Sequence, residues 1–242
     1  MSFELTIVLA VFLVAVLYSS VGHGGASGYL AVMALLSVSS EITRPTALVL
    51  NLFVASIAFI QFYRAGNFDW KIFLPFAAAS VPMAFIGGSV HLSPAIYKII
   101  LGAALILAAI RLAVNLKSES EPNTPKIWIC LMIGGLLGLV SGLVGVGGGI
   151  FLTPILLLMN WTTTKKAAGI SALFILVNSI SGLLGNRAQV LELPSTVRIW
   201  IAAAIFGGII GATVGSYRFN SLMLRRVLAF GLFIAGLKLI FT

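Results

Sequence analysis

Two apolar segments of this chain are too long to be single membrane-spanning helices. Residues 5–38 and 127–161 contain no Asp, Glu, Lys or Arg. As straight helices of 34 and 35 residues they would be about 50 Å long, whereas the hydrocarbon core of a bilayer is about 30 Å thick. Glycines interrupt each segment near its middle, in VGHGG at residues 21–25 and in VGVGGG at residues 144–149. The sequence therefore predicts two helical hairpins that enter the membrane and return.

Six further apolar segments have the length of ordinary membrane spans. Because 60% of the residues are hydrophobic and 9% are charged, no soluble stretch is long enough to form a core of its own. We therefore expect an all-α integral membrane protein with eight hydrophobic segments in one transmembrane domain, residues 1–242. The first segment carries Glu4 and no Lys or Arg, so we interpret it as a retained helix rather than a cleaved signal peptide. The six expected spans are residues 45–63, 72–90, 94–110, 167–185, 199–217 and 221–241.

The order of these segments repeats within the chain. Residues 1–114 and 127–242 each contain a glycine-broken hairpin followed by three spans, and a polar linker at residues 115–126, expected to be mobile and cytoplasmic, joins them. VGHGG aligns with VGVGG at an offset of 123 residues, and LFV at 52–54 aligns with LFI at 173–175. Three crossings per half, an odd number, would invert the second half relative to the first. Interrupted helices at matching positions of such repeats indicate the substrate site of a secondary transporter.

The basic residues favour the hairpin arrangement over eight separate crossings. We expect the charged residues, which give a formal net charge of +9, to lie in the loops. With eight crossings the 15 Lys and Arg residues divide 8 against 7, which predicts no orientation. With two hairpins they divide 10 against 5, and the positive-inside rule then places the linker in the cytoplasm and both termini outside. The five residues on the outer side would be Arg44, Lys98, Arg187, Arg198 and Lys238.

Several chemistries find no support in the residues. All six carboxylates lie in loops or at segment ends, so we expect no buried acid for a proton relay or a hard-cation site. The chain has one cysteine, Cys130, and no His/Cys cluster with metal-binding spacing, so we expect neither a metal nor a cofactor. No Gly-Lys-Ser/Thr follows the glycines, and no basic patch is interleaved with aromatic residues, which argues against nucleotides and nucleic acids. Without a catalytic triad or paired carboxylates, an intramembrane enzyme is disfavoured as well.

The first break contains His23, and an ionisable side chain inside a membrane is costly. This histidine could be hydrogen-bonded to a backbone carbonyl within a packed hairpin, or it could bind a ligand or carry a proton at a midplane site. The glycines around it could allow a tight turn and close packing, or could expose N–H groups at a helix N-terminus that attracts negative charge. Both explanations can hold for the glycines at once.

Polar residues on the first span of each half are further candidates. Asn51 and Asn178 lie on these two segments, and interhelical hydrogen bonding is the alternative explanation for each of them. Glycines also recur at every fourth residue in 134–142 and 207–215, and we interpret these as close helix contacts. The expected substrate-binding residues are Ser20, His23, Gly24, Gly25, Ser27, Asn51, Gly147, Gly148, Gly149, Ser171 and Asn178.

The stretch GLVSGLVGVGGGIFLTPILLL at residues 138–158, with its first-half counterpart YSSVGHGGASGYLAVMALL, resembles the TauE/SafE sulfite exporter family, also called the toluene sulfonate uptake permease family. The resemblance covers essentially the whole chain. It implies transport of small sulfur-containing anions, such as sulfite, organosulfonates or sulfoacetate, across a bacterial inner membrane. The first-half motif GHGGAS departs from the more regular glycine motif of many members, which leaves the substrate preference open.

We therefore expect a secondary carrier that binds its anion near the bilayer midplane, between the two glycine breaks. A passive anion channel is the alternative, and an intramembrane enzyme or an assembly factor is a third class. The expected partners are the anion and the lipid bilayer, with H+ or Na+ as the candidate coupling ion.

Overall fold

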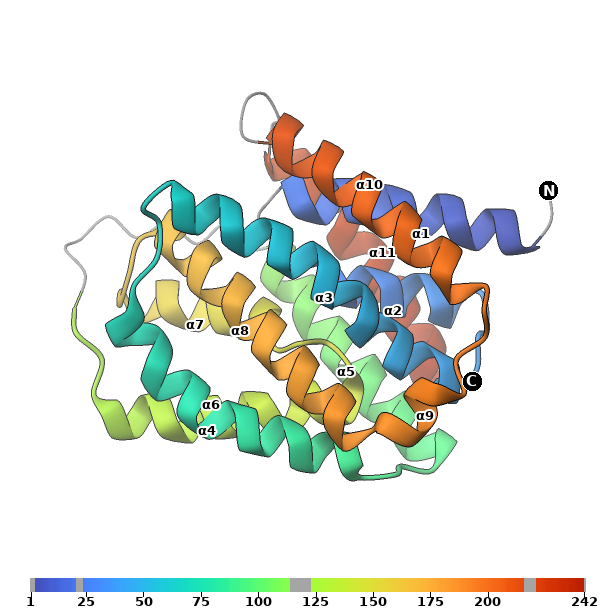
Figure 1. Ribbon diagram of the computed structural model, residues 1–242, viewed down its shortest axis with the longest axis horizontal. Helices are drawn as coiled ribbons and strands as arrows, with labels where there is room; N and C mark the ends of the chain where they lie inside the picture. The colour runs from blue at the N-terminus through green and yellow to red at the C-terminus, as the bar shows by residue number, and fades with distance from the viewer. Residues whose placement is uncertain (1–2, 21–23, 114–122, 216–220, 242) are drawn as a thin grey trace.

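The computed structural model describes residues 3–20, 24–113, 123–215 and 221–241. All regular structure within these ranges is helical, in agreement with the expected all-α class. The helices (Figure 1) are α1 (Phe3–Ser20), α2 (Ala26–Leu35), α3 (Ser40–Arg64), α4 (Trp70–Ser89), α5 (Pro94–Ala113), α6 (Ile127–Val144), α7 (Gly149–Leu158), α8 (Thr164–Gly185), α9 (Arg187–Leu191), α10 (Val197–Gly215) and α11 (Ser221–Phe241).

Both long apolar segments are interrupted at the predicted glycines. The first break separates α1 from α2, and the second separates α6 from α7. Gly25 and Gly148 immediately precede α2 and α7 and have φ angles of 84° and 76°, in the left-handed region that favours glycine. Because α2 and α7 each have ten residues, they are about 15 Å long, roughly half the thickness of the hydrocarbon core. The described residues of both breaks are buried inside the molecule.

Helices from the two halves of the chain pack on each other in pairs. On α6, Gly134, Gly138 and Gly142 meet the backbone of α4 so closely that a side-chain carbon would collide with it. Gly207 and Gly211 of α10 meet the backbone of α1 in the same way. The predicted close helix contacts are therefore confirmed at these five glycines. Since α5 also packs along α11 and α3 along α8, the two halves share one interior (Figure 1).

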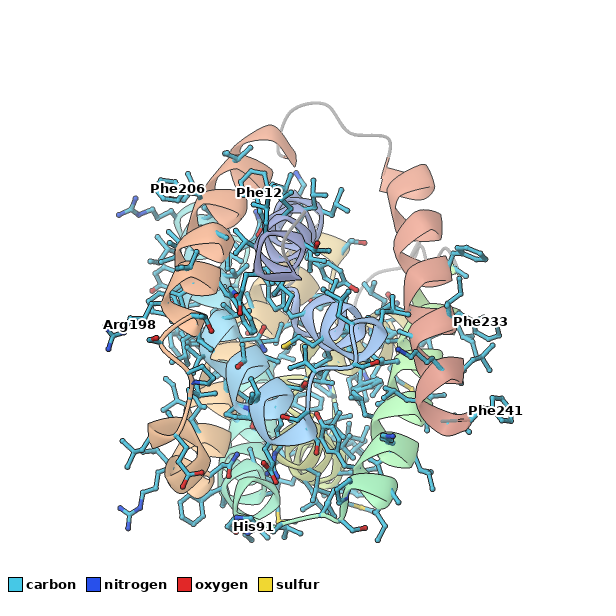
Figure 2. The ribbon with its side chains drawn as sticks, turned by 90° about the vertical axis from the view of Figure 1, so that its right-hand side faces the viewer. Phe12, His91, Arg198, Phe206, Phe233 and Phe241 are labelled. Atoms are coloured by element: carbon cyan, nitrogen blue, oxygen red, sulfur yellow. The ribbon has the colours of Figure 1, made fainter. Side chains whose placement is uncertain are left out.

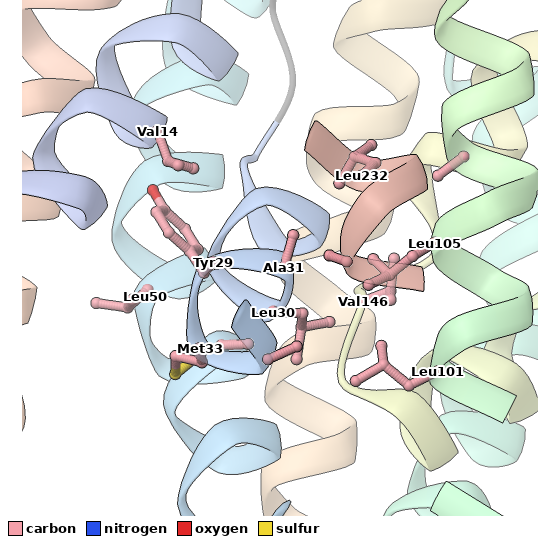
Figure 3. Packing of buried hydrophobic residues seen from close by; sticks show 14 of the residues in the cluster. Val14, Tyr29, Leu30, Ala31, Met33, Leu50, Leu101, Leu105, Val146 and Leu232 are labelled. Carbon is pink, nitrogen blue, oxygen red and sulfur yellow. The ribbon is translucent and has the colours of Figure 1, made fainter. Parts of the chain in front are cut away.

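The largest hydrophobic cluster surrounds α2. Tyr29 and Leu30 of α2 belong to the same cluster as Leu105 of α5 and Val146 of the second break (Figure 3). Val146 aligns with His23 in the sequence repeat, and its exposed fraction is 3%. The second break is thus anchored in an apolar interior at the position where the first break carries a histidine.

The outer surface is apolar, as is typical of a multi-pass membrane protein. Phe206 and Phe233, for example, point outward (Figure 2) and have exposed fractions of 64% and 42%. Among the described residues, α3, α4, α6 and α8 are long and apolar enough to cross a bilayer. The six expected spans correspond to α3, α4, α5, α8, α10 and α11, whereas the five-residue helix α9 is an element that the sequence did not predict.

Candidate functional site

The side chain of Asn51, on α3, links the two glycine breaks. It is fully buried, and its Nδ2 donates a hydrogen bond to Ser179 Oγ of α8 at 3.3 Å and lies 3.5 Å from the carbonyl oxygen of Val146 in the second break. Its Oδ1 faces the first break, since a Cβ atom added to Gly24 would lie 3.3 Å from it. Gly147 lies against the Nδ2 of the same amide. The structure therefore brings together Asn51, Gly24 and Gly147 from the predicted set.

A second residue that lies between the breaks is Ile175 of α8. A Cβ atom added to Gly24 would be 3.1 Å from Ile175 Cγ2, and one added to Gly147 would be 2.9 Å from the same atom. Gly149, at the start of α7, lies against this side chain as well. Nothing in the sequence points to Ile175, because an isoleucine in an apolar span does not differ from its neighbours. Its side chain occupies the space where the two breaks approach each other.

The second break is held against α8 by Ser171 and its neighbours. Thr153 Oγ1 of α7 lies 2.7 Å from Ser171 Oγ and 3.1 Å from the carbonyl oxygen of Gly149, within hydrogen-bond distance of both. A Cβ atom added to Gly148 would lie 2.8 Å from the ring of Phe174. The predicted residues Gly147, Gly148, Gly149 and Ser171 thus form one group, in which Ser171 connects α7 to α8.

Ser27 has a different position from the rest of the predicted set. Its hydroxyl donates a hydrogen bond to Tyr18 Oη of α1 at 3.0 Å, so it joins the two arms of the first hairpin. Gly25 lies against the ring of Tyr29, one turn further along α2. His23 and the side chain of Ser20 lie outside the described residues.

The N-termini of α2 and α7 provide backbone hydrogen-bond donors at the two breaks. The first N–H groups of a helix have no acceptor within that helix, and they carry a partial positive charge. Neither Gly25 nor Gly148, the N-cap residues, supplies a side-chain hydrogen bond to these groups. Such an uncapped helix N-terminus is suited to binding an anion.

The other predicted asparagine, Asn178, lies on α8 three residues after Ile175 and therefore on the same side of the helix. Its Nδ2 donates to the carbonyl oxygen of Phe174 at 2.8 Å. Asn178 Oδ1 and Asn51 Oδ1 are both buried, and neither accepts a hydrogen bond from the part of the chain that the structure describes. The predicted pair of asparagines thus presents two buried acceptors that have no donor among the described residues.

A buried arginine near the second break was missed by the sequence analysis. Arg44 was expected in an outer loop, but it lies on α3 and its exposed fraction is 4%. Its guanidinium donates hydrogen bonds to four backbone carbonyls: from Nη2 to Gly87 at 2.7 Å and to Gly88 at 2.6 Å, from Nη1 to Val90 at 3.0 Å, and from Nε to Gly142 at 3.0 Å. These carbonyls lie at the C-terminal ends of α4 and α6, where the helix dipole favours a cation. They replace water around the charge, which is why the arginine can be buried.

A pocket of about 320 Å³ opens near the C-terminal end of α2. Its lining includes Lys98, Tyr97 and Lys238, together with the acidic Glu41. Tyr97 Oη donates a hydrogen bond to the carbonyl oxygen of Val144, the last residue of α6 before the second break, at 3.3 Å. This pocket therefore lies next to the backbone of the candidate site.

Comparisons with known proteins agree with this architecture. A family model described as sulfite exporter TauE/SafE matches residues 7–239. The probable membrane transporter protein y4hK of Sinorhizobium fredii is 40% identical over 237 residues, which cover 96% of each chain. The probable membrane transporter proteins YjnA and YdhB of Bacillus subtilis are 27% and 28% identical, and the matches cover 98% and 97% of this chain and 100% and 99% of the relatives. No solved structure matches the chain.

Proposed function

Because the chain belongs to the TauE/SafE sulfite exporter family, we propose that it is a secondary carrier of a small sulfur-containing anion, such as sulfite, an organosulfonate or sulfoacetate. The membrane is the bacterial inner membrane, and the anion binds between the two glycine breaks. The transporter class follows from the family and from the names of the relatives. The substrate, the site and the carrier mechanism are the proposed parts.

The position of Asn51 is the observation that carries the site. This one amide lies against Gly24 in the first break and against Gly147 in the second. The uncapped N-termini of α2 and α7 begin at the same two breaks, so their N–H groups can replace part of the hydration of an anion. His23 belongs to the proposed site on the basis of the sequence alone.

We further propose that residues 1–114 and 127–242 are inverted repeats. The helix pairing supports this arrangement, since α1 packs on α10 while the corresponding α6 packs on α4. The directions of the central helices support it too: in Figure 1, α3 runs from right to left and α8 runs from left to right. Inverted repeats allow a carrier to alternate between two states by exchanging the packing of its halves.

The packing of the two short helices favours a carrier over a channel. α2 packs against α11, and Lys238 Nζ of α11 lies 3.2 Å and 2.9 Å from the carbonyl oxygens of Ala34 and Leu35 at the end of α2. Beside the corresponding α7 lies an apolar crevice of about 780 Å³, lined by residues of α5, α6 and α7. The two short helices therefore pack differently against their partner helices. We expect such a difference between the repeats when a carrier is in one of its two alternating states.

Counterflow in proteoliposomes tests the proposed function. Vesicles loaded with unlabelled sulfite should accumulate labelled sulfite transiently, because a carrier exchanges substrate across the membrane. A channel would show flux without counterflow, and an enzyme would leave an altered product. The absence of any flux for sulfite, ethanesulfonate and sulfoacetate would remove the proposal.

A glycine-to-alanine substitution, which adds one methyl group between the two breaks, tests the proposed site. Gly24→Ala places a Cβ atom 3.1 Å from Ile175 and 3.3 Å from Asn51 Oδ1, so we expect at least a roughly tenfold loss in kcat/KM, about 1.4 kcal/mol. Gly135→Ala is the matched control, because its Cβ would meet only ordinary contacts at 3.7 Å and 3.8 Å. Equal transport by the two variants would show that the breaks do not line the site.

A further inference from the structure

The orientation of the Asn51 amide is fixed by its neighbours. Its Nδ2 lies near the backbone carbonyl of Val146, which can only accept a hydrogen bond, and near Ser179 Oγ. The acceptor atom Oδ1 must therefore point the other way, toward Gly24. The amide of Asn178 is oriented by the same logic, since its Nδ2 donates to the carbonyl oxygen of Phe174.

The interior between the breaks thus contains two kinds of polar group. The N-termini of α2 and α7 are donors, whereas Asn51 Oδ1 is a buried acceptor without a partner among the described residues. A buried acceptor without a hydrogen-bond donor is costly, and it repels any ligand oxygen that bears no hydrogen. A ligand that satisfies both groups offers acceptor oxygens together with a hydrogen to donate, whereas an anion without such a hydrogen leaves Asn51 Oδ1 unpaired and binds more weakly.

We propose that this site selects an oxoanion in its protonated form, hydrogensulfite rather than the sulfite dianion, with Asn51 Oδ1 accepting the hydrogen of the ligand. The proposal rests on the function proposed above and deepens it. Sulfite takes up one proton from water on one side of the membrane and releases it on the other. In the described part of the chain Glu4 and Glu41 are exposed, Asp69 caps α4 at the surface, and Glu192 is exposed. The ligand itself is then the carrier of the proton.

The pH dependence of sulfite binding tests this proposal on the wild-type protein. Half-saturating concentrations of total sulfite are measured by competition against a labelled substrate, at one pH below and several above the pKa of hydrogensulfite. We expect the half-saturating concentration to rise about tenfold for each pH unit above that pKa, as the protonated fraction falls. Ethanesulfonate, which remains a single anion throughout this range, should show no such rise.

The comparison with ethanesulfonate also separates the protonation of the ligand from that of ionisable groups of the protein. The buried ionisable side chains described on α3 and on the helices packed against it are Tyr18, Tyr29, Tyr97 and Arg44, and tyrosine and arginine do not change charge near neutral pH. His23 lies outside the described residues. Because a change in its charge would act more strongly on a dianion than on a monoanion, the ratio is also measured in His23→Gln, where its pH dependence should persist. The ratio of sulfite affinity to ethanesulfonate affinity therefore reports the protonation of the ligand.

Asn51→Leu supplies a second measurement. This variant removes the acceptor, so the sulfite-to-ethanesulfonate ratio should become independent of pH. Ser56→Ala on the same helix should behave as wild type, because Ser56 donates its hydrogen bond to the carbonyl of Leu52 in its own helix. A wild-type protein that transports sulfite with a pH-independent ratio, or with an affinity that rises with pH, would overturn the proposal and leave the transport function standing. A protein that transports neither anion would instead overturn the function on which the proposal rests.

Discussion

At the scale of single residues, Ile175 determines how much space the two breaks enclose. Its side chain lies against Gly24, Gly147 and Gly149, so a ligand between the breaks must displace it. Ile175→Ala should shift the preference toward larger sulfonates by about tenfold or more, because a methylene group in an apolar pocket is worth about 1–3 kcal/mol. The measurement is the ratio of kcat/KM for ethanesulfonate and sulfite.

Two variants control for a general loss of packing in this experiment. Ile175→Val removes a single methylene group at the same position, so its ratio should lie between those of the wild type and Ile175→Ala. Leu184→Ala lies on the same helix, but the leucine is 60% exposed on the outer surface, so this change should leave the ratio unaltered. An unaltered ratio in Ile175→Ala would mean that this residue does not border the ligand.

Arg44 gives a prediction about stability. Lysine has three donors and arginine has five, so Arg44→Lys cannot satisfy all four carbonyls that the guanidinium now binds. We expect a loss of about 1–3 kcal/mol, seen as a lower Tm in detergent. Arg198→Lys, at an exposed position, should leave the Tm unchanged. An equal Tm for both variants would show that the carbonyls find other partners.

Sequence reasoning identified the glycines and asparagines of the candidate site for a physical reason. Glycine runs and amides are rare inside apolar spans, so each stands out against its surroundings. Ile175 could not be selected, because nothing distinguishes it from other apolar residues of α8. Arg44 was assigned to a loop because the partners that permit its burial are backbone carbonyls of α4 and α6, which carry no sequence signal.

At the scale of helices, the close contact between α4 and α6 depends on glycines, which have no side chain to hold the two backbones apart. A Cβ atom at Gly138 would overlap the backbone of Ser80, so Gly138→Ala must push the two helices apart. We expect a loss of about 1–3 kcal/mol, as is typical of overpacked interiors, measured as a lower Tm. Gly135→Ala, one residue position from the contact line, should not lower the Tm. A normal Tm for Gly138→Ala would argue against the close approach of these helices.

The crevice between α5 and α7 predicts a movement that can be trapped. If α7 closes onto α5 in the second state, cysteines at Leu107 and Ile155, which line the crevice, should become cross-linked and transport should stop. The background is Cys130→Ala, which removes the single native cysteine. Reduction should restore transport, and each single-cysteine variant should transport normally. Continued transport by a fully cross-linked protein would exclude this closure from the cycle.

The helices themselves were largely predictable, whereas their pairing was not. The lengths of the apolar segments and the glycine runs were enough to predict the broken helices α1–α2 and α6–α7, because the bilayer thickness limits the length of a span. In the structure α6 pairs with α4, and α1 pairs with α10. Each pairing places the glycines of one helix against the backbone of a particular partner helix. The sequence shows the glycines but gives no indication of the partner.

At the scale of the whole molecule, the ends of the chain define its two sides. α1 begins and α11 ends toward one end of the long axis, and α6 begins at the opposite end (Figure 1). Of the five basic residues assigned to the terminal side, Arg44 is buried among carbonyls and so leaves Lys98, Arg187, Arg198 and Lys238, four against ten on the other side. With Arg44 excluded, the charge bias that predicts a cytoplasmic linker becomes stronger.

Fusing reporters to both termini and into the linker tests this orientation. An enzyme that folds only outside the cytoplasm should be active at the N-terminus and at the C-terminus and inactive when inserted between residues 115 and 126, while a cytoplasmic reporter should give the reverse pattern. The proposed inverted repeats require the two termini to share one side, because each half contributes an odd number of crossings. Termini on opposite sides would therefore exclude the inverted arrangement. Two cytoplasmic termini would preserve the repeats and reverse only the orientation, in spite of the bias of ten basic residues against four.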